Sequence, residues 1–174
     1  AGFSPELIPE ALKGEPVEKV NRTRALGTAL QDVGAFFGML TFTTVATLLT
    51  RRLAFLCSFL LCFFTVAFVF FGLKTEAQAY WMLPLMGFAT LSAFAGYSIY
   101  FPELFPTRLR GTGVGFCYNT VRYLAAPAPV MLGHLSTWVG SFRGAAILMC
   151  SVYIVGIVAL IWAPETKGKP LPED

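Results

Sequence analysis

From Leu53 to Thr166 the chain has only eight Asp, Glu, Lys or Arg residues in 114 positions. The other 15 charged residues lie before Leu53 or after Thr166. A soluble domain carries about 25% charged residues, and so sparsely charged a stretch cannot cover a water-soluble fold. The sequence therefore predicts a protein embedded in a lipid bilayer.

Five stretches are long and apolar enough to cross a bilayer, which takes about 20 residues. Three have no charge; the stretch with Asp32 and the stretch with Arg122 and His134 are still apolar enough to insert. We expect an all-α fold, a polytopic membrane helix bundle with transmembrane helices at residues 25–50, 53–73, 77–101, 111–135 and 144–163. Residues 1–24 would form an external segment with short helices, and residues 164–174 a cytoplasmic tail.

The basic residues of the loops predict the orientation. Alternating spans put six of them on one side, and only Lys74 and Arg143 on the other. Because cytoplasmic loops are enriched in Lys and Arg, the larger group and the C-terminus are expected on the cytoplasmic side. The membrane would be a cell membrane, either a plasma membrane or a bacterial inner membrane. Four basic residues in the external segment weigh against this orientation. The larger group is Arg51, Arg52, Arg108, Arg110, Lys167 and Lys169.

The connection after the third predicted span combines residue types that an ordinary loop does not need. It reads Pro-Glu-Leu-Phe-Pro-Thr-Arg-Leu-Arg-Gly-Thr-Gly from Pro102 to Gly113. The prolines stop the helix and hold the turn extended, and the glycines let the next helix approach a neighbour closely. The positive bias of cytoplasmic loops explains the arginines, but not the acid, prolines and glycines at this spacing.

A second short pattern, Pro-Glu-Thr-Lys-Gly-Lys, follows the last predicted span from Pro164 to Lys169. Together the two patterns resemble the major facilitator superfamily, in which they follow helices ten and twelve. The match is most like sugar porters and related metabolite and organic-ion symporters, and it covers residues 25–169 as helices eight to twelve. Because that family places its solute site between two six-helix halves, the resemblance implies a C-terminal fragment whose partner is the missing N-terminal half.

The resemblance also implies a gate at the cytoplasmic end. In the family, loop arginines pair with acids at the ends of helices ten and twelve and hold the inward gate closed. One family feature is missing: the loop between helices eight and nine keeps its paired arginines, but Ala46–Arg52 lacks the usual glycine and aspartate. The gate charges carried over to this chain are Arg51, Arg52, Glu103, Arg108, Arg110 and Glu165.

Arg122 is the strongest candidate for contact with a transported solute. It lies about 16 Å into the membrane, and a charge at that depth should face a wet cavity or a partner. Asn119 and Tyr118 share its side of the helix, although a structural arginine paired to another helix would fit as well. Asp32 could pair with Arg122 or carry a proton, or it could belong with Gln31 to an external vestibule.

These features predict secondary active transport of a small polar organic solute, such as a sugar or organic acid, by alternating access, with a proton as candidate coupling ion. The alternative is a transporter-like sensor or binding protein that does not translocate solute. A net charge of +3 gives no reason to expect nucleic acid. With one His and one Asp within the spans, no pattern for an intramembrane enzyme is evident, and no cofactor or metal is expected.

Overall fold

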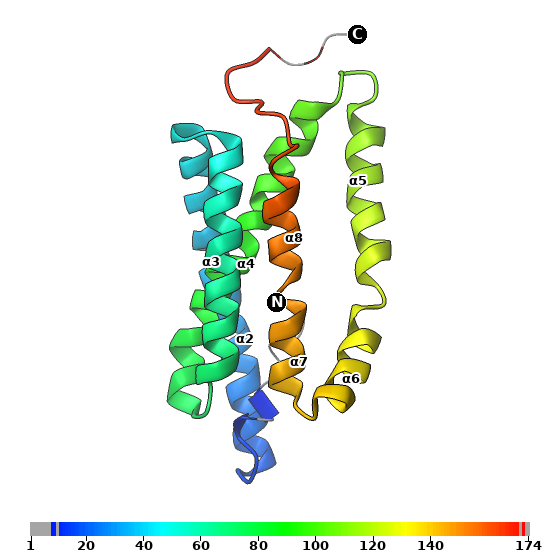
Figure 1. Ribbon diagram of the computed structural model, residues 1–174. Helices are drawn as coiled ribbons and strands as arrows, with labels where there is room; N and C mark the ends of the chain where they lie inside the picture. The colour runs from blue at the N-terminus through cyan, green and yellow to red at the C-terminus, as the bar shows by residue number, and fades with distance from the viewer. Residues whose placement is uncertain (1–7, 10, 171, 173–174) are drawn as a thin grey trace.

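The computed structural model describes residues 8–9, 11–170 and 172, so parts of the predicted external segment and tail lie outside the described residues. The described part is helical and has no strand, which confirms the all-α membrane helix bundle (Figure 1). The helices are α2 (Val17–Leu48), α3 (Arg51–Gly72), α4 (Glu76–Leu104), α5 (Arg110–Ala125), α6 (Ala128–Val139), α7 (Phe142–Met149) and α8 (Val152–Ala159).

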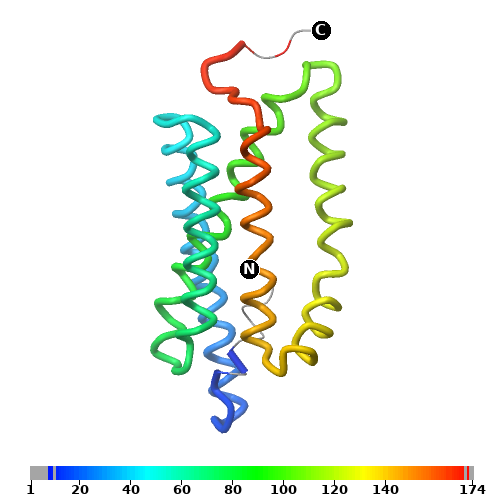
Figure 2. Tube along the Cα trace, in the orientation of Figure 1, coloured from blue at the N-terminus to red at the C-terminus, as the bar shows by residue number. Residues whose placement is uncertain are grey.

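Among the described residues, four helical stretches are long and apolar enough to span a membrane: α2, α3, α4, and α7 with α8 taken as one. Their connections lie at two opposite ends of the bundle. The turn between α2 and α3, the α4–α5 connection and the C-terminal segment share one end, which we call the tail end (Figure 1). The tube view shows the chain running back and forth between this end and the other (Figure 2).

Side-chain caps explain where α3 and α4 begin. The Thr50 hydroxyl accepts a hydrogen bond from the Leu53 N–H at the start of α3. At the start of α4, Thr75 and Gln78 form a capping box, in which each side chain accepts from the other residue's backbone N–H. Such caps satisfy N–H groups that have no partner inside the helix.

Helices α2 and α4 pack with their backbones almost in contact. A Cβ atom at Gly34 or Gly38 would overlap the carbonyl oxygen of Pro84 or Phe88, and one at Gly87 would overlap that of Gln31. Small residues at such crossings are typical of membrane helices, whose association depends on close van der Waals packing. We call this contact the glycine seam.

Two of the predicted spans are not continuous helices. The expected helix over residues 111–135 is divided into α5 and α6, because Pro127 and Pro129 have no amide hydrogen for the helical ladder. The expected helix over residues 144–163 is divided into α7 and α8. Between these two, Ser151 N–H bonds to Leu148 O at 3.1 Å in a tighter turn with i to i−3 spacing.

Candidate functional site

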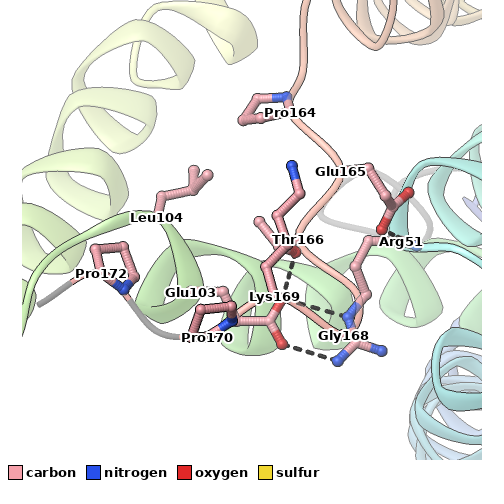
Figure 3. A pocket seen from close by; sticks show the side chains of 10 residues that line it. All are labelled: Arg51, Glu103, Leu104, Pro164, Glu165, Thr166, Gly168, Lys169, Pro170 and Pro172. Atoms are coloured by element: carbon pink, nitrogen blue, oxygen red, sulfur yellow. Dashed lines mark hydrogen bonds and ion pairs between the residues drawn. The ribbon is translucent and has the colours of Figure 1, made fainter.

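A cluster of charged and polar side chains lies at the tail end, where α3 begins, α4 ends and the tail passes (Figure 3). The side chains come from positions far apart in the sequence. Their centre is Arg51 of α3, whose guanidinium meets a carboxylate from α4 and whose backbone N–H meets a carboxylate from the tail. We call the set of Arg51, Glu103, Glu165 and Thr166 the tail cluster.

Arg51 and Glu103 form a two-pronged ion pair. Arg51 Nη2 lies 2.8 Å from Glu103 Oε1, and Arg51 Nε lies 3.2 Å from Oε2. Thr166 also donates its hydroxyl hydrogen to Glu103 Oε2, and Arg51 Nη1 donates to the Ala46 carbonyl near the end of α2. The two charged side chains are 15% and 20% exposed. Because two parallel hydrogen bonds orient the pair, it holds α3 and α4 in one specific arrangement.

Glu165 is bound by the start of α3 through the backbone. The N–H groups of Arg51 and Arg52 donate to its two oxygens at 2.9 and 3.1 Å. The Lys167 N–H adds a third bond, at 3.0 Å. A helix N-terminus favours a negative charge because its first N–H groups point outward and its dipole is positive there.

These bonds affect the acidity of Glu165. Partial burial alone would raise the pKa of this carboxyl group, because it disfavours the charged form. The backbone hydrogen bonds from Arg52, Lys167 and Arg51 have the opposite effect and outweigh it. The pKa of Glu165 is therefore lower than its ordinary value.

Two further contacts fasten the tail, and neither was predicted. Tyr100 OH donates to the Pro164 carbonyl at 2.7 Å, and Lys167 Nζ donates to the Leu48 carbonyl at 2.7 Å. Lys167 and Thr166 belong to the Pro-Glu-Thr-Lys-Gly pattern, so a signal for them was present. The sequence signal for Tyr100 was only its position near a helix end, and a tyrosine at the membrane interface has the same position.

Next to the tail cluster is a pocket of about 390 Å³ (Figure 3). Arg51 and Glu103 line one side of it, and Lys169 and the tail prolines Pro170 and Pro172 line another. The tail thus folds over the ends of α3 and α4 and leaves a space beneath it.

The other three predicted gate arginines do not place their side chains on either carboxylate. Arg52 donates to the carbonyls of Leu160 and Ile161 at the end of α8, at 2.8 to 3.1 Å. Arg110 donates to the Pro102 carbonyl at 3.0 Å, and Arg108 is exposed, with no ion pair to any described residue. The expectation that all four arginines meet the acids is corrected: only the Arg51 side chain does. Arg52 follows Arg51 by about 100° around the helix axis, which turns it away from Glu103.

The predicted solute residues lie on two helices, α5 and α2. Arg122 is exposed on α5, and no described carboxylate forms an ion pair with it. Asn119 donates to the Gly115 carbonyl of its own helix at 2.9 Å, and the Tyr118 hydroxyl is 3.1 Å from Ser98 Oγ on α4.

Asp32 and Gln31 are neighbours in sequence but lie on different faces of α2. Asp32 is exposed, whereas Gln31 is 4% exposed and lies at the glycine seam. Of the alternatives for Asp32, the pairing with Arg122 is not formed, since no ion pair connects them in the described structure.

At the opposite end, a second group of charges holds α2 against α4. Lys19 Nζ lies 3.1 Å from Glu15 Oε2 and 3.6 Å from Glu76 Oε2, and Tyr80 donates to Glu76 at 2.6 Å. No specific pattern in the sequence points to this group, because its members are spread over two helices and a loop.

Long apolar helices, connections at two ends and a charged cluster at one of these ends define a multi-pass membrane protein. Its cluster joins the start of α3, the end of α4 and the tail.

Comparison with known proteins agrees with this class. The chain is 32% identical over 104 residues to a "Probable 4-methylmuconolactone transporter" of Cupriavidus pinatubonensis, covering 60% of this chain and 24% of that protein. It is 34% identical over 146 residues to the "Inner membrane metabolite transport protein YgcS" of Escherichia coli, covering 82% of this chain and 31% of that protein. It is 29% identical over 90 residues to a "Cis,cis-muconate transport protein" of Acinetobacter baylyi, covering 52% of this chain and 22% of that protein. No protein-family model matches the chain.

These relatives are transporters of the major facilitator type, and the resemblance predicted from the two motifs is confirmed: the chain is related to that superfamily. It spans between about a fifth and a third of the length of the curated relatives that it matches.

Proposed function

We propose that the chain works as helices eight to twelve of a secondary active transporter that carries a small organic acid by alternating access. The observation that carries the proposal is the tail cluster, which ties the ends of α3 and α4 and the tail together at one end of the bundle. The relatives support the solute class, because two of them are named for muconate or a muconolactone, and cis,cis-muconate is a dicarboxylate.

The strength of the tail cluster suits a gate that closes and opens in each transport cycle. Exposed ion pairs contribute about 0–1 kcal/mol each, and charge-assisted two-pronged pairs contribute more. The sum of a few such bonds can be overcome when solute binds, whereas a deeply buried network would lock the end permanently. In this proposal the tail end faces the cytoplasm and the cluster closes it in the outward-facing state.

Arg122 is proposed to bind the carboxylate of the solute. It lies about 18 Å from Arg110 along the axis of α5, near the middle of a hydrocarbon core about 30 Å thick. Its guanidinium has no carboxylate partner among the described residues, so its donors can form a two-pronged bond with a solute. Asn119 and Tyr118 would complete the polar side of the site. Asp32 is the proposed proton carrier, and Gln31, buried at the glycine seam, is not part of the proposed site.

Alternating access requires a second half against which this helix bundle can rock. We propose that a six-helix N-terminal half supplies it, in line with the small share of each relative's length that this chain covers. The solute would then bind between the two halves, on the side where α5 presents Arg122.

The experiment is uptake of radiolabelled cis,cis-muconate into vesicles that contain the full-length transporter. Arg122→Ala is expected to abolish saturable uptake without reducing membrane insertion, and Arg122→Lys to recover only part of it, because an ammonium cannot form the two-pronged bond. The control is Arg24→Ala, an exposed arginine of α2. Unchanged uptake by Arg122→Ala would refute the assignment.

The alternative, a sensor that binds solute without carrying it, gives a different result in the same vesicles. A transporter accelerates entry of labelled solute when unlabelled solute is preloaded inside, whereas a sensor shows binding with no such exchange.

A further inference from the structure

Between α3 and α8, at the tail end, is a groove of about 570 Å³ that the proposed transport mechanism does not use. Its walls are apolar, with Leu53 and Leu56 from α3 and Ile157, Val158 and Ile161 from α8 and the residues after it. Large apolar side chains are also exposed on α3, on α8 and just after α8, and they include Phe64, Phe68, Val155 and Trp162. The groove is therefore continuous with surfaces suited to lipid.

Arg52 lies at one end of this groove and has hydrogen-bond donors to spare. Its Nε and Nη2 atoms are bonded to the carbonyls of Leu160 and Ile161, which fixes the guanidinium over the end of α8. Its Nη1 atom has no hydrogen bond to the described residues, and the residue is exposed. The two N–H groups on Nη1 of this positively charged side chain are therefore available to bind a ligand.

Glu165 is the acidic residue in the lining of the groove, and it does not form an ion pair with the Arg52 side chain in the described structure. Both Glu165 oxygens accept backbone N–H groups. The end of the groove therefore has one basic side chain, Arg52, beside a carboxylate that already accepts three backbone N–H groups.

We propose that this groove binds an anionic phospholipid, with the phosphate on Arg52 Nη1 and an acyl chain along Leu53, Leu56 and Ile157. Arg52 lies at the level where α3 begins and α8 has just ended, which is where the headgroups of a bilayer leaflet meet a spanning helix. A basic residue beside an apolar groove between membrane helices is a combination that recognises anionic lipids. A soluble phosphate would gain nothing from the apolar walls, and a neutral lipid would gain less from Arg52.

This inference requires only that α3 and α8 lie in a bilayer, and it does not depend on which solute is carried or on transport at all. The experiment measures binding of dioleoyl phosphatidylglycerol to the full-length protein in nanodiscs of dioleoyl phosphatidylcholine, by lipid exchange and native mass spectrometry. Wild type is expected to retain phosphatidylglycerol in preference to phosphatidylcholine. Arg52→Gln is expected to weaken that preference about fivefold, the effect of one basic residue near a membrane surface.

Two matched variants separate the groove from general surface charge. Arg108→Gln removes an exposed arginine at the same end and is expected to bind phosphatidylglycerol like wild type. Leu56→Trp keeps Arg52 but fills the groove, and it is expected to lose the preference while remaining monodisperse. Because this second loss does not involve the bonds to Leu160 and Ile161, a local disturbance at Arg52 cannot account for it.

The proposal is overturned if Arg52→Gln keeps the full preference, or if Arg108→Gln loses as much as Arg52→Gln does. It is also overturned if glycerol 3-phosphate displaces the bound lipid at equal concentration, since the site would then recognise a soluble anion.

Discussion

At the scale of single residues, the tail cluster depends most on the pair between Arg51 and Glu103. The motifs after the third and fifth predicted spans pointed to both carboxylates, and the paired arginines after the first predicted span pointed to the guanidinium that binds Glu103. They could not predict that Arg52, Arg108 and Arg110 turn elsewhere, because side-chain direction depends on helix rotation and on which carbonyl groups lie nearby. Arg52 shows this directly: the end of α8 supplies two carbonyls to its guanidinium.

A double-mutant cycle at this pair tests its energy. Arg51→Ala and Glu103→Gln are expected to show a coupling energy of about 1 kcal/mol in thermal or denaturant unfolding of the detergent-solubilised protein, because the pair is partly buried and two-pronged. Arg108→Ala combined with Glu103→Gln is the control, and its effects should add. A coupling energy near zero for the first cycle would show that the pair contributes nothing to stability.

The acidity of Glu165 leads to a pH dependence. Because the pKa of Glu165 is lower in the folded protein than in the unfolded chain, its stabilising contribution is complete above the unfolded pKa of about 4.3 and is lost as the pH falls through the folded value. Glu165→Gln should therefore lower the melting temperature at pH 6 and reduce its further fall between pH 5 and pH 3. Glu18→Gln, at an exposed position on α2, is the control. If the melting temperatures of wild type and Glu165→Gln fall equally between pH 5 and pH 3, the stabilising role of the ionised Glu165 carboxylate is contradicted.

At the scale of helices, four of the five predicted spans overlap described helical stretches that are long and apolar enough to cross a membrane, but the apolar stretches did not show where each helix is interrupted. Pro127 and Pro129 were visible in the sequence, and the structure divides the fourth predicted span there into α5 and α6. The interruption between α7 and α8 has no proline, and the residues around Ser151 give no comparable signal. The glycine seam could not be predicted either, since the partner of each glycine is a backbone atom of another helix.

The glycine seam predicts that a glycine-to-alanine substitution lowers stability within the seam but not on α5. Gly38→Ala is expected to destabilise the protein by about 1–3 kcal/mol, because the added methyl group overlaps the Phe88 carbonyl and forces α2 and α4 apart. Gly115→Ala adds the same methyl group on α5, where nothing lies within 4 Å, and should leave stability unchanged or slightly raise it. The measurement is thermal unfolding in detergent. Equal effects of the two substitutions would mean that the seam is not closely packed.

At the scale of the whole molecule, the sequence predicted which connections lie together. The structure places the start of α3, the α4–α5 connection and the tail at one end, as alternation of the spans requires (Figure 1). Which end faces the cytoplasm follows from charge bias and from the family resemblance, and it stays a prediction.

Accessibility of single cysteines in intact cells tests that orientation. In a background without the four native cysteines, Lys169→Cys is expected to react with a membrane-impermeant thiol reagent only after the cells are opened. Lys74→Cys, an exposed position at the opposite end, should react in intact cells and serves as the matched control. The reverse pattern would place the tail outside and invalidate the proposed direction of the gate.

The way in which α3 holds Glu165 has a consequence for how such a protein can vary. Two of the three hydrogens that the carboxylate accepts come from the main chain at positions 51 and 52, so every amino acid except proline supplies them there. A change of side chain at position 51 or 52 therefore leaves these two bonds to the tail in place, whereas position 165 must keep an acceptor of the same reach.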